Sequence, residues 1–267
     1  MSVAKNMKAK ILELDQLPSQ LIEYGSIAIT RDFSPQQVVK MAVEKGAHHI
    51  VQKACRSFEQ ELLVSENMMF RPQEFLKDPV SMILEHKQVH NFRVDCAAQE
   101  HKKEPLEKLE GFIRGLAGSK GIITEVVAST EEIFTNASKN SGVFYKHLSS
   151  IGGIRGTAPV ARQGSMSVVA GATDDTLVVG VIDSFGLLDA HALLAKVLSC
   201  YENGVAQSIN MGTGGAGIGT FLVFSFAMNM YIAVEKNNRT AVFCSYPLGM
   251  RTRDFEILPK NLHLISI

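Results

Sequence analysis

GTGGAGIG (residues 212–219) runs directly into the apolar stretch TFLVFSFAMNMYIAVE (residues 220–235). Glycine lets a backbone approach a ligand closely, and the apolar residues that follow begin with a stretch of helical length. More than one phosphate-binding pattern uses glycines in this way, and an ordinary loop can carry them too. Each pattern implies a different fold, so the choice between them decides the architecture.

Two of these patterns fit poorly. A P-loop needs a lysine directly after its last glycine, and none follows here. Gly212, Gly214 and Gly217 spell the dinucleotide fingerprint GxGxxG, with Glu235 farther on. A Rossmann unit also needs a parallel sheet, whereas the remaining residues resemble an antiparallel hairpin and a tail. An NAD(P)-dependent enzyme is therefore only a third alternative.

Composition narrows the function classes. The chain has 267 residues, of which 46% are hydrophobic, and 27 basic residues balance 27 acidic ones. This balance gives no electrostatic argument for nucleic acid or for an acidic membrane surface. The four cysteines form no CxxC pair, the N-terminus lacks the apolar core of a signal peptide, and the longest apolar run (221–234) is short for a membrane span. We expect a cytoplasmic protein.

Periodicity and capping signals predict two parts, 1–80 and 88–267. In the first part we expect strands at 9–15, 25–30 and 48–52, helices at 34–47 and 57–70, and a connection at 71–79. In the second part we expect strands at 90–96, 165–172 and 175–183, helices at 104–121 and 123–140, and a helix or partly ordered lid at 189–204. The apolar helix and a hairpin that turns at 236–239 are expected to follow. The second part is therefore expected to be α+β with mostly antiparallel strands.

Polar residues upstream of the glycines suggest a site. Glu132 and Asn136 lie four residues apart on an expected helix, so they share one face. A buried carboxylate and carboxamide there would be explained by a bound Mg²⁺ and an oriented water or hydroxyl. Asp183 ends an apolar strand, where it could accept a hydrogen bond from an adenine amino group. The alternative is structural: a solvated glutamate, a helix-linking asparagine and a turn aspartate.

These motifs together resemble the GHKL (Bergerat-fold) ATPases, especially the anti-sigma-factor serine kinases and histidine-kinase ATPase domains. EEIFTNA (131–137) looks like their N-box, DSFG (183–186) their first glycine box, and GGAGIG (214–219) their second. The resemblance covers residues 88–250, about 60% of the chain. It implies a two-layer α/β sandwich of Bergerat type.

The resemblance also implies roles for single residues. Glu132 would be the catalytic base, Asn136 would bind Mg²⁺, and Asp183 would recognise the adenine of ATP. The remaining residues implied to contact or support the nucleotide are Lys139, Gly186, Gly215, Gly217, Gly219 and Thr240. One departure stands out: Phe185 occupies the place of the first glycine of the DxGxG box and displaces Gly186 by one, so a phenyl ring there could crowd the adenine. No phosphoacceptor histidine helix is evident.

The N-terminal part resembles the second half of a response-regulator receiver. Asp15, Thr30 and Lys53 fall at the places of its phosphoacceptor aspartate, its Ser/Thr and its lysine. The first two strands and their acidic pair are missing, so Mg²⁺ would have no pocket beside the aspartate. We therefore expect a truncated, receiver-like α/β module that serves docking or dimerisation.

The sequence thus predicts a bacterial signalling regulator that binds Mg-ATP. It would act as a serine kinase or as an ATP-dependent switch on a protein partner: a sigma factor, an anti-anti-sigma factor or a response-regulator-like protein. No nucleic acid or membrane partner is expected, and a homodimer is possible. The alternative is a degenerate, non-catalytic GHKL scaffold that regulates its partner by stoichiometric binding.

Overall fold

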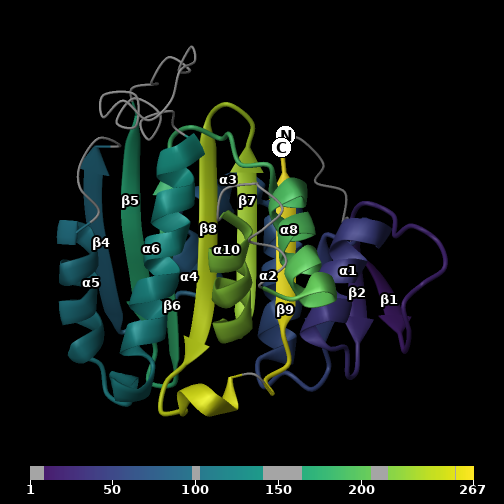
Figure 1. Ribbon diagram of the computed structural model, residues 1–267, viewed down its shortest axis with the longest axis horizontal. Helices are drawn as coiled ribbons and strands as arrows, with labels where there is room; N and C mark the ends of the chain where they lie inside the picture. The colour runs from purple at the N-terminus through teal and green to yellow at the C-terminus, as the bar shows by residue number, and fades with distance from the viewer. Residues whose placement is uncertain (1–8, 98–102, 141–163, 206–215, 256) are drawn as a thin grey trace, which may run out of the picture.

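The computed structural model describes all residues except 1–8, 98–102, 141–163, 206–215 and 256, and the described residues build one large mixed sheet (Figure 1). Its strands lie in the order β1-β2-β3-β9-β7-β8-β6-β5-β4. Their bounds are β1 Lys10–Leu14, β2 Ser26–Thr30, β3 His49–Gln52, β4 His90–Ala97, β5 Ser165–Ala172, β6 Thr176–Asp183, β7 Asn229–Glu235, β8 Arg239–Pro247 and β9 Asn261–Ser266.

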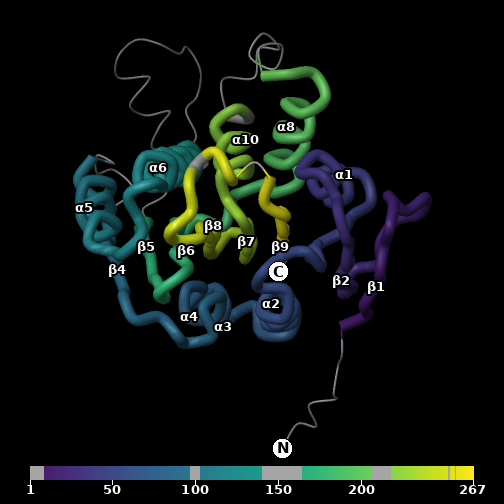
Figure 2. Tube along the Cα trace, turned by 90° about the horizontal axis from the view of Figure 1, so that it is seen from below, coloured from purple at the N-terminus to yellow at the C-terminus, as the bar shows by residue number. Residues whose placement is uncertain are grey.

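Helices cover both faces of this sheet (Figure 2). One face carries α1 (Pro35–Lys45), α5 (Lys103–Arg114), α6 (Ile123–Asn140), α8 (Ala190–Asn203) and α10 (Ala216–Phe226). The other face carries α2 (Phe58–Phe70), α3 (Pro72–Lys77) and α4 (Pro79–Ile83). Short 3₁₀ turns lie at Ser119–Gly121 and Thr252–Asp254. The fold is therefore α+β with three layers, and all the described helices of the second part, α5, α6, α8 and α10, lie on one face of the sheet.

The sheet combines two kinds of pairing. β1, β2 and β3 are parallel, whereas β4, β5, β6, β8 and β7 form an antiparallel series, as the sequence predicted for the second part. β9 joins them, because it pairs antiparallel to β3 and parallel to β7. The sequence predicted only a tail at this place. The sheet is continuous across the predicted boundary near residues 80–90, and the division into two domains stays a prediction.

The sequence predicted the ends of a helix best where capping residues were present. The Ser34 hydroxyl accepts from the backbone of Gln37, whose side chain accepts from the backbone of Ser34, and Gly46 ends α1 in a left-handed conformation. The prediction of a plain connection at residues 71–79 was wrong, because Pro72–Lys77 forms α3 and α4 begins at Pro79. Pro72 and Pro79 each begin a short helix, a position that proline tolerates.

A buried polar cluster joins α2 to the sheet. The Glu61 carboxylate accepts from the Tyr231 hydroxyl at 2.9 Å, and its Oε2 lies 3.1 Å from His263 Nε2. His263 Nδ1 lies 3.1 Å from the Ser65 hydroxyl and 3.5 Å from His49 Nδ1. Ser65, His263 and Glu61 line up as in a hydrolase, but each is at most 1% exposed, so no substrate reaches them. We regard the cluster as structural.

The buried histidines make stability depend on pH. Burial, together with His263 and His48, holds the pKa of His49 well below its ordinary value of 6.5. At pH values below 6.5 the unfolded chain protonates His49, whereas the folded chain keeps this side chain neutral. The free energy of unfolding should therefore fall on acidification, by about 1 kcal/mol between pH 6.5 and 5.5 for this group. Urea unfolding at both pH values measures the loss.

The matched variants are His49→Asn and His90→Gln, the latter at an exposed position of β4. His49→Asn should unfold more easily at neutral pH but lose less stability on acidification. His90→Gln should behave as the wild type. An unchanged pH slope in His49→Asn would contradict the prediction.

Candidate functional site

The predicted N-box lies on α6, and its polar side chains contact the start of α10. Asn136 Nδ2 donates to Glu132 Oε1 at 3.1 Å and to the Thr220 hydroxyl of α10 at 3.2 Å. Both bonds use the amide nitrogen, so neither engages the amide oxygen. A β-carbon added at Gly219 would overlap the Glu132 carboxylate. Glycine at position 219 therefore lets this carboxylate lie directly against the first turns of α10.

Asp183 and Thr240 face each other on adjacent strands. They are register partners where β6 pairs with β8, and both are buried. Burial raises the pKa of Asp183, and hydrogen bonds from the backbone of Phe185 and Gly186, with the nearby Thr240, partly oppose that rise. The Thr240 hydroxyl is buried, and among the described residues no partner meets it in good hydrogen-bond geometry.

The turn after Asp183 is tight. Asp183 Oδ1 accepts from the backbone nitrogens of Phe185 at 2.8 Å and Gly186 at 3.2 Å. Gly186 has φ +59°, and an added β-carbon would meet the backbone of the β7–β8 turn, at the Glu235 carbonyl and the Asn238 nitrogen. Its role in the structure is thus to let two turns approach each other. The buried Phe185 ring lies near Gly164.

A small cavity lies between these elements. Its volume is about 20 Å³, which is room for about one water molecule. The predicted residues Asn136, Asp183 and Thr240 all line it, so the structure brings together residues from α6, β6 and β8. The other lining residues are Ile133, Ala137, Val181, Leu188, Leu193, Thr220, Val223, Met230 and Val242. Phe185 is not among the described residues that line the cavity.

The other predicted residues lie around this cavity or outside the described residues. Glu132 is half-buried and reaches the cavity through its bond to Asn136. Lys139 lies on α6 one turn beyond Asn136 and is half-buried. Gly217 lies in the first turn of α10. Gly215 lies outside the described residues, as do Gly212 and Gly214.

Sequence reasoning missed Thr220, Leu188 and Leu193. Thr220 directly follows the last glycine of the second glycine box, which was the one available signal for it. The two leucines belong to an apolar segment that the sequence marked only as a helix or lid. Nothing in their spacing shows that they would fill the cavity.

The three residues of the receiver-like pattern end neighbouring parallel strands. Thr30 ends β2, whereas Asp15 and Lys53 directly follow β1 and β3. Lys53 Nζ bonds the Glu13 carboxylate at 2.8 Å, and Asp15 lies 3.7 Å from Arg31. These are exposed ion pairs, which contribute little to stability.

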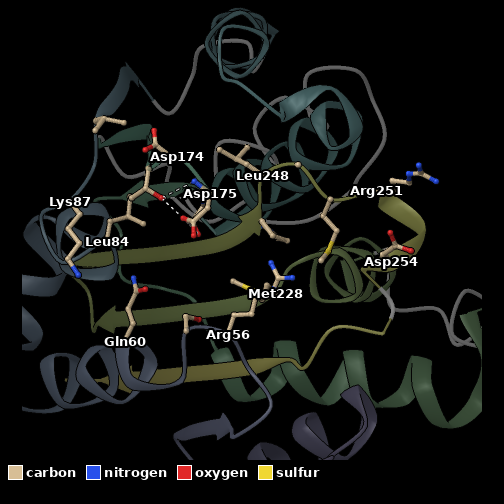
Figure 3. Close-up of a pocket in the computed structure, with 17 residues that line it drawn as sticks. Arg56, Gln60, Leu84, Lys87, Asp174, Asp175, Met228, Leu248, Arg251 and Asp254 are labelled. Atoms are coloured by element: carbon tan, nitrogen blue, oxygen red, sulfur yellow. Dashed lines mark hydrogen bonds between the residues drawn. The ribbon is translucent and has the colours of Figure 1, made fainter.

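A larger cleft opens at the opposite end of β6 (Figure 3). Its volume is about 840 Å³. Figure 3 shows Lys87 and Gln60 at one end and Arg251 and Asp254 at the other. Its charged lining residues are Arg56, Lys87, Arg251, Asp174, Asp175 and Asp254. Since acidic and basic groups balance, the cleft offers no net charge that would select a phosphate.

The described residues contain no group of three or more His, Cys, Asp or Glu side chains that could hold a metal ion. They also include no helix with both the length and the apolar character needed to cross a bilayer.

No family model matches the chain, and no curated protein matches its sequence. The site must therefore be interpreted from its own geometry.

The geometry of Gly186 predicts a large effect of a single methyl group. Gly186→Ala should lower the free energy of unfolding by about 2–4 kcal/mol, because alanine is strained at positive φ and would press on rigid backbone. Gly25→Ala is the matched control, since Gly25 has φ +82° but nothing within 4 Å of an added β-carbon. Gly25→Ala should lower the free energy of unfolding by only about 1–2 kcal/mol, the cost of alanine at positive φ. Urea unfolding measures both, and equal losses would contradict a backbone clash at Gly186.

Proposed function

We propose that the chain is a signalling regulator that binds Mg-ATP in the cavity between α6, α10, β6 and β8. The observation that supports this most is the convergence of Asn136, Asp183 and Thr240 on that cavity, since they are far apart in sequence. Asn136 and Asp183 belong to separate motifs of the GHKL resemblance, and Thr240 is a further residue that the resemblance implies. The proposal names a Bergerat-type ATPase fold within the observed α+β architecture.

Adenine recognition would rest on Asp183 and Thr240. The carboxylate can accept a hydrogen bond from the exocyclic amino group, and its orientation is set by the backbone nitrogens of Phe185 and Gly186. The Thr240 hydroxyl is buried beside the Asp183 carboxyl, where it would also contact the base. Apolar side chains such as Val181 and Met230 provide the walls that a flat base requires.

The phosphate end would lie toward Glu132 and the start of α10. Backbone N–H groups at a helix N-terminus favour anions. The Asn136 amide oxygen and waters would hold Mg²⁺, which would neutralise charge on the phosphates. Glu132 would orient and deprotonate the attacking hydroxyl or water, and the Asn136 amide holds its carboxylate in place. The acceptor would be a serine of a protein partner or water.

The partner would be a signalling protein: a sigma factor, an anti-anti-sigma factor or a response-regulator-like protein. The receiver-like module would then serve docking or dimerisation. The protein would act in the cytoplasm, and its partners would include neither nucleic acid nor a membrane.

Base selectivity tests the proposal. Asp183→Asn keeps an oxygen for the two backbone donors but replaces the other oxygen by an NH₂ group. It should weaken binding of a non-hydrolysable ATP analogue by about 10–100-fold, since the amide would face the adenine amino group as donor against donor. Asp183→Asn should lose much less affinity for the matching inosine nucleotide, which has a carbonyl in place of the adenine amino group. Titration calorimetry with Mg²⁺ measures both affinities.

Asp174→Asn is the matched control, because Asp174 is exposed at the other end of the β5–β6 hairpin. It should leave both affinities unchanged. Equal affinities of wild type and Asp183→Asn for both nucleotides would contradict adenine recognition by Asp183. The absence of heat at millimolar ATP analogue, with Asn136→Ala indistinguishable from wild type, would contradict nucleotide binding altogether.

The size of the cavity favours a second candidate, a non-catalytic scaffold that regulates its partner by binding alone. A volume of about 20 Å³ is far below the roughly 300–1,000 Å³ of ligand pockets. Leu188 and Leu193 are among the side chains that line it, whereas Phe185 is not. If the scaffold is right, Leu193→Ala should gain no affinity for the ATP analogue. If the nucleotide is the ligand, the same variant should bind more tightly than wild type.

A further inference from the structure

One segment that lines the cavity continues into α8. Leu188 precedes this helix, and Leu193 lies in its first turn. Between them, the Asp189 side chain caps the helix by accepting from the Ala192 nitrogen at 2.9 Å. Because the cap ties this stretch to the helix, both leucines should move with α8.

The same helix is anchored on α1. His191 Nε2 lies 3.0 Å from the Val43 carbonyl, which belongs to the last turn of α1 and so lacks an intrahelical partner. Farther along, Lys40 of α1 lies 4.0 Å from Glu202 of α8. Figure 2 shows α8 with α1 on one side and α10 on the other. The helix therefore bridges the receiver-like part and the cavity.

His191 and Leu193 act on different sides of α8. They are two residues apart, which is about 200° around the helix axis. One of them contacts α1, whereas the other lines the cavity. Because both lie in the first turn of α8, a movement of that turn that enlarges the cavity also disturbs the contact between His191 and Val43.

We propose that α1 regulates the nucleotide cavity by holding α8 over it. This inference rests on the proposed function. Ligand binding and α1–α8 docking then oppose each other, and linkage makes the effect reciprocal: a nucleotide loosens α8 from α1, and whatever tightens that contact lowers nucleotide affinity. A partner that binds the receiver-like part could in this way control the cavity without touching it.

A reversible crosslink tests the proposal. Lys40→Cys and Glu202→Cys would be joined by a short bismaleimide whose spacer contains a disulfide, while the four native cysteines are all buried. The crosslinked protein should bind an ATP analogue with Mg²⁺ at least about tenfold more weakly than the same protein after the spacer is reduced. The Glu202→Cys single variant, labelled with a monofunctional maleimide, should bind like wild type.

His191→Ala tests the opposite direction. Loss of the α1 cap should release α8 and tighten nucleotide binding by about 2–10-fold, the worth of one hydrogen bond. A merely structural histidine would leave the affinity unchanged or lower it. His86→Ala, on the connection after α4, is the control and should have no effect.

The outcomes separate the two proposals. Equal affinities in the crosslinked, reduced and His191→Ala proteins would overturn the regulation and leave nucleotide binding intact. Absence of binding in every form, including His191→Ala, would overturn the proposed function and this inference together.

Discussion

The single sheet depends on the side chain of Asn261. Its oxygen accepts from the Gln52 backbone at 2.8 Å, and its nitrogen donates to the Asn229 oxygen at 2.7 Å. Asn229 in turn donates to Glu61 at 2.7 Å. Where β9 enters between β3 and β7, one amide thus satisfies backbone and side-chain groups on both neighbours. Without it, buried polar groups on either side would lose their partners.

Lys260, the preceding residue, extends this constraint to the site. Its ammonium group is buried and donates to the carbonyls of Ser225, Ala227 and Phe255 at 2.7–2.9 Å. The first two lie at the end of α10, where carbonyls lack helical partners and a cation is favoured. The charge is tolerated because these carbonyls replace its water. The chain segment that inserts β9 therefore also positions the helix that begins at the glycine box.

The sequence predicted what is local and missed what is distant. The capping residues Ser34 and Gly46 predicted the two ends of α1. Asp183, just before a glycine turn, predicted the end of β6. Helical spacing placed Asn136 beside Glu132, whereas only the resemblance to a family pointed to Thr240. No local signal could place β9, since its pairing with β3 links positions more than two hundred residues apart. For the same reason no local signal could place Leu193 at the cavity, which it lines from α8.

The position of β9 also has a consequence for the time course of folding. Gln52 and Asn261 are separated by 209 residues. At roughly 5–20 residues per second, a ribosome needs about 10–40 s to synthesise that interval. For all that time β3 presents an unpaired edge with buried-type side chains, a hazard for association with other chains. The helix α1 is synthesised early, whereas the sheet on which it packs is completed only when the last strand emerges.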